Sequence, residues 1–116
     1  MGDLVTPVTR ILGVVLVVVG LLGFFMSSPL LGFFEVDTLH NIIHLASGVV
    51  ALVVAGNHSM ARMYLIIFGL VYAAVAVIGF VQGNTVLGLF VVNMADHYLH
   101  AAIAALCLVV GFGSKA

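Results

Sequence analysis

The chain has 116 residues, of which 65% are apolar and only 6% are charged, and its formal net charge is −1. A water-soluble domain of this size cannot cover its surface with so few charged side chains. Long apolar runs are typical of helices that cross a membrane, and a net charge near zero gives no basis for nucleic-acid binding. The composition therefore predicts an all-α integral membrane protein, with residues 1–116 forming a single transmembrane domain.

Four apolar stretches predict a bundle of four membrane-spanning helices. They cover residues of about 7–26, 37–55, 59–82 and 94–112. Asp37, Ser59 and Asn93 stand where N-caps are expected, because their side-chain oxygens can accept from free N–H groups of a first helical turn. Two apolar connections, 30–36 and 85–92, are expected at one end of the bundle.

The two halves of the chain repeat. A shift of 56 residues aligns them without a gap and pairs Gly13 with Gly69, Asp37 with Asn93, and His44 with His100. Chance agreement among valines and leucines is common in such a sequence, but agreement of glycines, caps and a histidine is not. This predicts two parallel helical-hairpin repeats, about 7–56 and about 59–112.

The charged residues predict the orientation. Arg10, Arg62 and Lys115 fall on one side of the predicted bundle, while acidic residues such as Glu35 and Asp37 fall on the other. The positive-inside rule then places both termini in the cytoplasm. The expected location is the inner membrane of a bacterium.

Polar residues in the second and fourth spans recur at steps of three and four, so each set shares one helix face. In the second span they are Asp37, His40, Asn41 and His44, and in the fourth they are Asn93, Asp96, His97 and His100. Small residues, which let membrane helices approach closely, are expected at helix contacts: Gly13, Gly48, Gly69, Ala101 and Ala104. The pattern predicts that the second and fourth helices pack face to face, with the first and third outside.

Two motifs resemble a known family. The segments Leu39-His40-Asn41-Ile-Ile-His44 and Asn93-Met-Ala-Asp96-His97-Tyr-Leu99-His100 resemble the bacterial membrane family called domain of unknown function 4383. That family has four predicted spans, with an HNxxH-type motif opening the second and an N-x-x-D-x-x-x-H-type motif opening the fourth. His97 departs from the family pattern. The resemblance implies a four-helix membrane fold and a bacterial membrane location, and it implies no activity.

One interpretation of the histidines is a metal or haem site. Neutral imidazole is the commonest protein ligand for metals, so His40, His44, His97 and His100 are the candidate ligands. His44 and His100 would bind zinc, copper or iron, or the two faces of a haem. Asp37, Asn41 and Asp96 would orient the rings, and Asn93 would act as a cap.

The alternative is that these groups only hydrogen-bond to one another across the bundle. The sequence favours that alternative, and with it a non-enzymatic accessory subunit that packs against larger membrane partners or further copies of itself. A proton relay through His44 and His100 would need a polar exit toward the cytoplasm. Tyr64 is expected to anchor its helix at the membrane interface.

Overall fold

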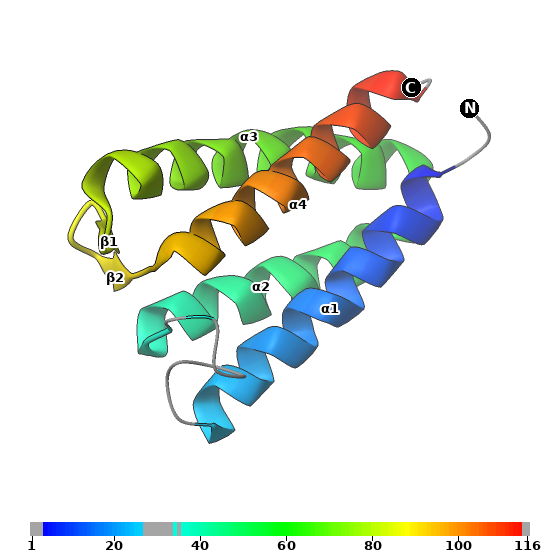
Figure 1. The fold of residues 1–116 in the computed structure, drawn as a ribbon. Coiled ribbons are helices and arrows are strands. Elements are labelled where there is room, and N and C mark those ends of the chain that lie inside the picture. The colour runs from blue at the N-terminus through cyan, green and yellow to red at the C-terminus, as the bar shows by residue number, and fades with distance from the viewer. Residues whose placement is uncertain (1–3, 27–33, 35, 115–116) are drawn as a thin grey trace.

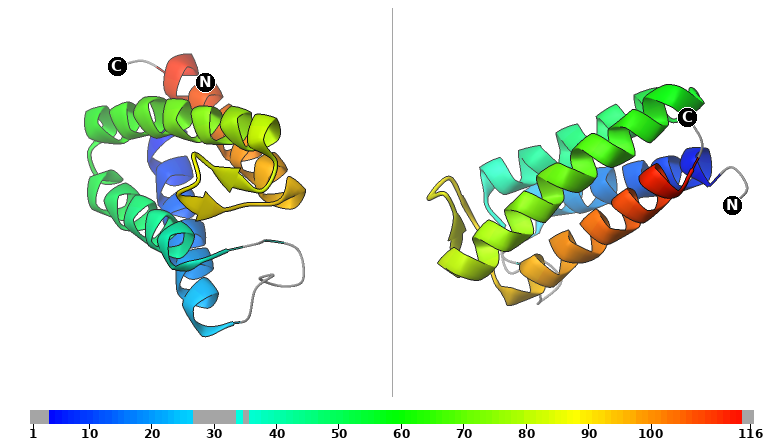
Figure 2. Two further views of the ribbon diagram at one scale, coloured as in Figure 1. Left: turned by 90° about the vertical axis from the view of Figure 1, so that its left-hand side faces the viewer. Right: turned by 90° about the horizontal axis from the view of Figure 1, so that it is seen from above.

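The computed structural model describes residues 4–26, 34 and 36–114, which form four helices and one short β-hairpin (Figure 1). In chain order the elements are α1 (Val5–Phe25), α2 (Thr38–Val54), α3 (His58–Gln82), β1 (Thr85–Val86), β2 (Phe90–Val91) and α4 (Met94–Gly113). The start of α1 and the end of α4 lie at one end of the bundle, and the hairpin lies at the other (Figures 1 and 2). The four predicted helices are therefore present.

Three of these helices, α1, α3 and α4, are long and apolar enough to cross a membrane. The fourth, α2, has 17 residues and is about 25 Å long at the usual helical rise. Large apolar side chains on every helix point outward, and Ile11, Val53, Val81 and Val109 are 65–80% exposed. Such extensive exposed apolar surface suits lipid rather than water, so the fold is that of a helical membrane protein.

Side-chain caps begin three of the helices. Asp37 Oδ1 accepts from the backbone N–H of His40 at 2.9 Å, and Asn93 Oδ1 accepts from that of Asp96 at 3.0 Å, which confirms both predicted caps. The predicted cap at Ser59 is wrong, because Asn57 takes this place and accepts from Met60 N at 3.0 Å. Asn57 has an extended backbone, so its amide can reach the first turn, while Ser59 is already helical.

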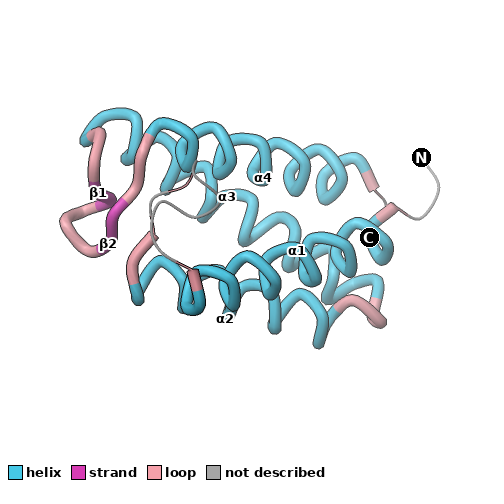
Figure 3. Tube along the Cα trace, turned by 60° about the horizontal axis from the view of Figure 1, so that its bottom comes forward, coloured by secondary structure: helices cyan, strands magenta, loops and turns pink. Residues whose placement is uncertain are grey.

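The second apolar connection contains the β-hairpin, which the sequence did not predict (Figure 3). Thr85 pairs with Val91, and Val86 pairs with Phe90. Positive φ angles at Leu87 and Gly88, 55° and 70°, match a type I′ turn, which is usually signalled by Asn-Gly or Asp-Gly. The turn was not predicted because leucine, at position 87, stands where asparagine or aspartate is usual. The first connection, 30–36, lies mostly outside the described residues, as do Glu35 and Lys115.

The helices form two pairs, in which α1 packs on α2 and α3 packs on α4 (Figures 1 and 2). The predicted close packing of the second helix on the fourth is wrong, because no Cα atom of α2 lies within 8 Å of one in α4. Gly48 shows why: a Cβ there would lie 2.7 Å from Val17 N and 2.8 Å from Gly13 O. The small residues of α2 thus serve contact with α1.

The first and third helices are not peripheral, as the sequence had suggested. Leu16 of α1 and Leu65 of α3 are 2% and 0% exposed and belong to the main core cluster. The two helix pairs meet along α1 and α3 and along α2 and α3. Because the backbones of α2 and α4 stay apart, the space between them near the hairpin is available to side chains.

Candidate metal site

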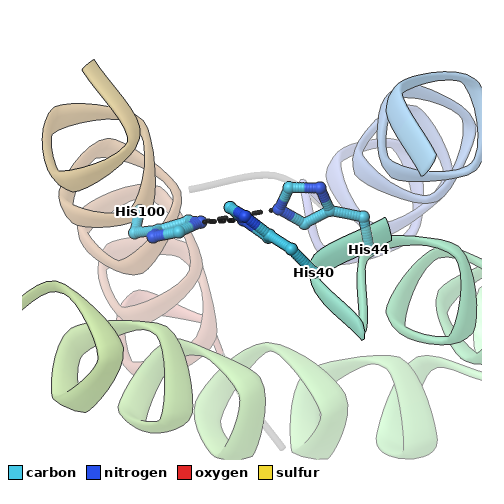
Figure 4. A group of neighbouring side chains, drawn as sticks. All are labelled: His40, His44 and His100. Carbon is cyan, nitrogen blue, oxygen red and sulfur yellow. Dashed lines mark hydrogen bonds between the residues drawn. The ribbon is translucent and has the colours of Figure 1, made fainter. Parts of the chain in front are cut away.

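Three histidine rings fill that space. His40 and His44 project from α2 and His100 projects from α4, and the rings point toward one another (Figure 4). The Nε2 atom of His100 lies 3.4 Å from Nε2 of His40 and 3.5 Å from Nε2 of His44. All three side chains are at most 1% exposed. We call this cluster of His40, His44 and His100 the histidine trio.

The positions of the three histidines follow from where α2 and α4 begin. His40 stands three residues after the α2 cap and His44 one turn later, while His100 stands seven residues after the α4 cap. Residues at such spacings share a helix face, so both helices aim imidazoles at the same level of the bundle. Aromatic rings close the sides: Phe90 of β2 lies 5.1 Å from His40, and Tyr72 of α3 lies 5.6 Å from His100, between ring centroids.

The hairpin determines which nitrogen of His40 carries the proton. Nδ1 of His40 lies 2.9 Å from the carbonyl oxygen of Val91. A carbonyl oxygen can only accept, so Nδ1 donates its proton, and Nε2 of the neutral ring carries the lone pair. That lone pair is on the nitrogen nearest His100. His40 is therefore held in the form that a metal ligand needs.

His44 and His100 do not have such support. Their Nδ1 atoms are buried and have no hydrogen-bond partner among the described residues. Their Nε2 atoms meet at 3.5 Å, longer than the roughly 2.7–3.2 Å of an ordinary protein hydrogen bond. The histidines therefore hydrogen-bond to one another as expected, but these bonds are long and leave the Nδ1 atoms of His44 and His100 without a partner among the described residues.

A bound metal ion accounts better for the spacing. Imidazole nitrogens bind zinc at about 2.0–2.1 Å in tetrahedral geometry, which separates two ligand nitrogens by about 3.3–3.4 Å. The two separations that involve His100, 3.4 and 3.5 Å, are close to this value. One ligand atom from each of the three histidines lies within 4.8 Å of the other two. The trio can thus surround one ion.

The remaining candidates lie around the trio but outside it. Nε2 of His97 lies 2.9 Å from the carbonyl oxygen of Gly83. Because a carbonyl oxygen can only accept, Nε2 donates this hydrogen bond. Its ring packs on Phe80. Asp96 Oδ2 accepts from Asn93 N at 2.9 Å and completes a capping box. These contacts direct His97 and Asp96 away from a shared ligand position.

Asn41 has a packing role in the structure. Its side chain is 3% exposed and lies against Gly23 of α1, where any Cβ would collide with the amide. Its neighbour Asp37 caps α2 through one carboxylate oxygen and contacts the hairpin through the other, which accepts from Val91 N at 2.9 Å. Asp37 therefore lies two contacts away from the His40 ring.

Two tyrosines of α3 differ from the sequence expectations: Tyr64 was expected elsewhere, and Tyr72 was not identified. Tyr64 is 4% exposed and donates to the Ser47 carbonyl at 2.8 Å, so its expected place at the membrane interface is wrong. Tyr72, which closes one side of the trio, is 3% exposed. Both lie on a helix face with Leu65, Gly69 and other buried residues, and that helical spacing was the available signal.

Fold and site together define a small helical membrane protein with a buried histidine cluster. A family model described as domain of unknown function (DUF4383) matches residues 7–113, nearly the whole chain. The protein belongs to this family, as its two motifs predicted. Comparison with curated proteins and with solved structures finds no match.

Proposed function

We propose that this membrane protein binds one transition-metal ion through Nε2 of His40, His44 and His100. The observation that carries the proposal is the convergence of three buried imidazole rings. Their ligand atoms lie within 4.8 Å of one another, and Nε2 of His100 lies 3.4 Å from Nε2 of His40 and 3.5 Å from Nε2 of His44. Ionisable residues inside a membrane bundle are costly to keep there and are therefore functional candidates. A site for an ion gives these three buried rings a reason to face one another.

The donor set selects the kind of ion. Imidazole nitrogen suits zinc, copper, iron and nickel, whereas calcium and magnesium require oxygen ligands. Three protein ligands leave a fourth tetrahedral position for water or another small ligand. Haem is disfavoured, because a flat macrocycle between His44 and His100 would also have to pass between His100 and His40, whose Nε2 atoms lie only 3.4 Å apart.

The test is metal analysis of protein purified without a histidine tag, followed by titration of the metal-free protein with Co²⁺ and Zn²⁺. We expect one equivalent of metal and a tetrahedral Co²⁺ absorption spectrum. His44→Ala and His100→Ala should abolish both. His97→Ala is the matched control, since His97 is equally buried but lies outside the trio. Wild-type protein that binds neither ion would overturn the proposal.

A second candidate is the accessory subunit that the sequence favours. An open apolar groove of about 350 Å³ runs between α1 and α4 and is lined by side chains such as Ile11, Val15, Ala102 and Leu106. A helix of a larger membrane protein or of a further copy would bury this groove. Co-purification in mild detergent tests it, and Val15→Trp should weaken any stable complex. A chain that remains a lone monomer in native lipid would argue against it.

For the topology we propose two parallel hairpin repeats, about 7–56 and about 59–112, with both termini in the cytoplasm of a bacterium and the protein in its inner membrane. Gly13 lies against Leu52, and Gly69 lies against Leu108, so the same contact recurs after a shift of 56 residues. Cysteines introduced at His58 and Leu87, with Cys107 replaced by alanine, should be labelled from opposite sides. Labelling of both from one side would contradict this topology.

A further inference from the structure

We propose that Asp37 is a positioning residue for the metal site, because it fixes the protonated nitrogen of His40 through the backbone of Val91, whose N–H it binds and whose carbonyl oxygen accepts from the His40 ring. The inference rests on the proposed metal binding. It assigns to Asp37 more than the capping of α2, namely control over which nitrogen of His40 is presented to the ion.

Three contacts of equal length connect the carboxylate with the ring. Oδ1 of Asp37 accepts from the backbone N–H of His40 at 2.9 Å, and Oδ2 accepts from the backbone N–H of Val91 at 2.9 Å. The carbonyl oxygen of Val91 then accepts from Nδ1 of His40 at 2.9 Å. Asp37 thus binds both the start of α2 and the strand that receives the His40 proton.

The contact with Val91 is the part of this arrangement that capping does not require. At the matching position of α4, the amide of Asn93 caps the helix by accepting from Asp96 N at 3.0 Å. An amide offers one acceptor oxygen, whereas a carboxylate offers two. The second oxygen of Asp37 is the one that holds β2 against the trio.

The physical effect is on orientation and proton position. Hydrogen bonds to a carboxylate are stronger than those to a neutral acceptor, so Asp37 holds the N–H side of Val91 in place. The carbonyl of Val91, which belongs to the next peptide group, then stays directed at His40. Ligand histidines generally donate their second N–H to such a group, and loss of that partner typically lowers metal affinity about 10- to 100-fold. Val91 is the equivalent partner here.

The decisive variant is Asp37→Asn. Its single amide oxygen can serve His40 N or Val91 N but not both, so the cap remains available while the hold on β2 is lost. Asp37→Ser is the second variant, because serine caps well and is too short to serve both groups. Asn93→Asp is the control, since it keeps the α4 cap and lies on the other helix.

The measurement is ¹⁵N NMR of histidine-labelled, metal-free protein, with Zn²⁺ affinity measured in parallel. In wild-type protein His40 should carry its proton on Nδ1. Asp37→Asn and Asp37→Ser should mix the two proton positions and weaken Zn²⁺ binding about 10- to 100-fold, while Asn93→Asp changes neither.

A His40 ring that keeps its Nδ1 proton in both Asp37 variants would overturn the inference. Because this readout uses metal-free protein, it is independent of the proposed function. Wild-type protein that binds no Zn²⁺ but shows the expected change in His40 would reject the metal site and retain Asp37 as the residue that orients the ring.

Discussion

The starts of α2 and α4 follow one plan with different outcomes. Each helix has a polar N-cap, Asp37 or Asn93, and each has a histidine seven residues later, His44 or His100. Three residues after the cap, α2 has His40 where α4 has Asp96. That one position decides whether the side chain completes a capping box, as Asp96 does, or joins the histidine trio, as His40 does.

In α4 the acidic side chain of Asp96 contacts the cap of its own helix. Asp96 accepts from Asn93 N, so the cap and the third helical residue satisfy one another. In α2 a histidine occupies that position, and its ring reaches toward His100 instead. The α2 start therefore depends on the hairpin for its remaining contacts, through Val91. With an imidazole in that position, the Asp37 carboxylate keeps its local cap and adds a long-range contact with Val91.

The largest expected effect comes from His100→Ala, which removes the nitrogen shared by both contacts in the trio. Bound metal should be lost, and with it the stabilisation that a ligand at a hundred times its Kd supplies, about 2.7 kcal/mol. Thermal unfolding with and without a chelator measures this. The chelator should lower the Tm of wild-type and His97→Ala protein and leave His100→Ala unchanged; equal chelator responses would refute it.

Asp37→Ala and Asn93→Ala compare the two caps directly. Loss of a cap costs about 1 kcal/mol, which is the expected effect in α4. In α2 the same truncation also removes the charged acceptor of Val91 N, and a hydrogen bond to a charged group is worth about 1.5–3 kcal/mol. Equilibrium unfolding in mixed micelles should show Asp37→Ala as less stable by that difference. Equal losses would mean that the hairpin contact adds no stability.

Helix packing should respond unequally in the two pairs. A Cβ at Gly48 would meet the backbone of α1, at Val17 N and Gly13 O, which cannot move aside. A Cβ at Gly69 would meet the Leu108 side chain at 2.8 Å, which can rotate. We expect Gly48→Ala to cost about 1–2 kcal/mol, within the range for overpacking, and Gly69→Ala to cost less. The same unfolding assay decides the order, and a reversed order would be inconsistent with these contacts.

The smallest effect should come from the tyrosines that line α3. Tyr64→Phe removes the hydrogen bond to the Ser47 carbonyl, a contact between the two helix pairs, and should cost about 1 kcal/mol. The Tyr72 hydroxyl is buried without a hydrogen-bond partner among the described residues. Tyr72→Phe should therefore be neutral or slightly stabilising. A clear loss of stability in Tyr72→Phe would show that its hydroxyl has a partner, such as an ordered water molecule.

The membrane class, the four helices, the family and the caps at Asp37 and Asn93 could all be predicted without the structure. These depend on signals that act within one segment: apolar length, a side-chain oxygen that reaches its own first turn, and a short motif. The helix faces on which His44 and His100 lie could be predicted from the same local rules. Even the cap at Asn57 was missed by only two residues.

The choice of which histidines lie together in the trio could not be predicted, because it depends on tertiary packing. His40 and His97 were equal candidates by spacing, yet His40 joins the trio and His97 bonds Gly83. The central positions of α1 and α3, the β-hairpin at Val91 and the burial of Tyr64 were likewise not predicted. Each of these depends on contacts between residues far apart in the chain, which local periodicity does not encode. The proposed metal site therefore depends on packing between helices.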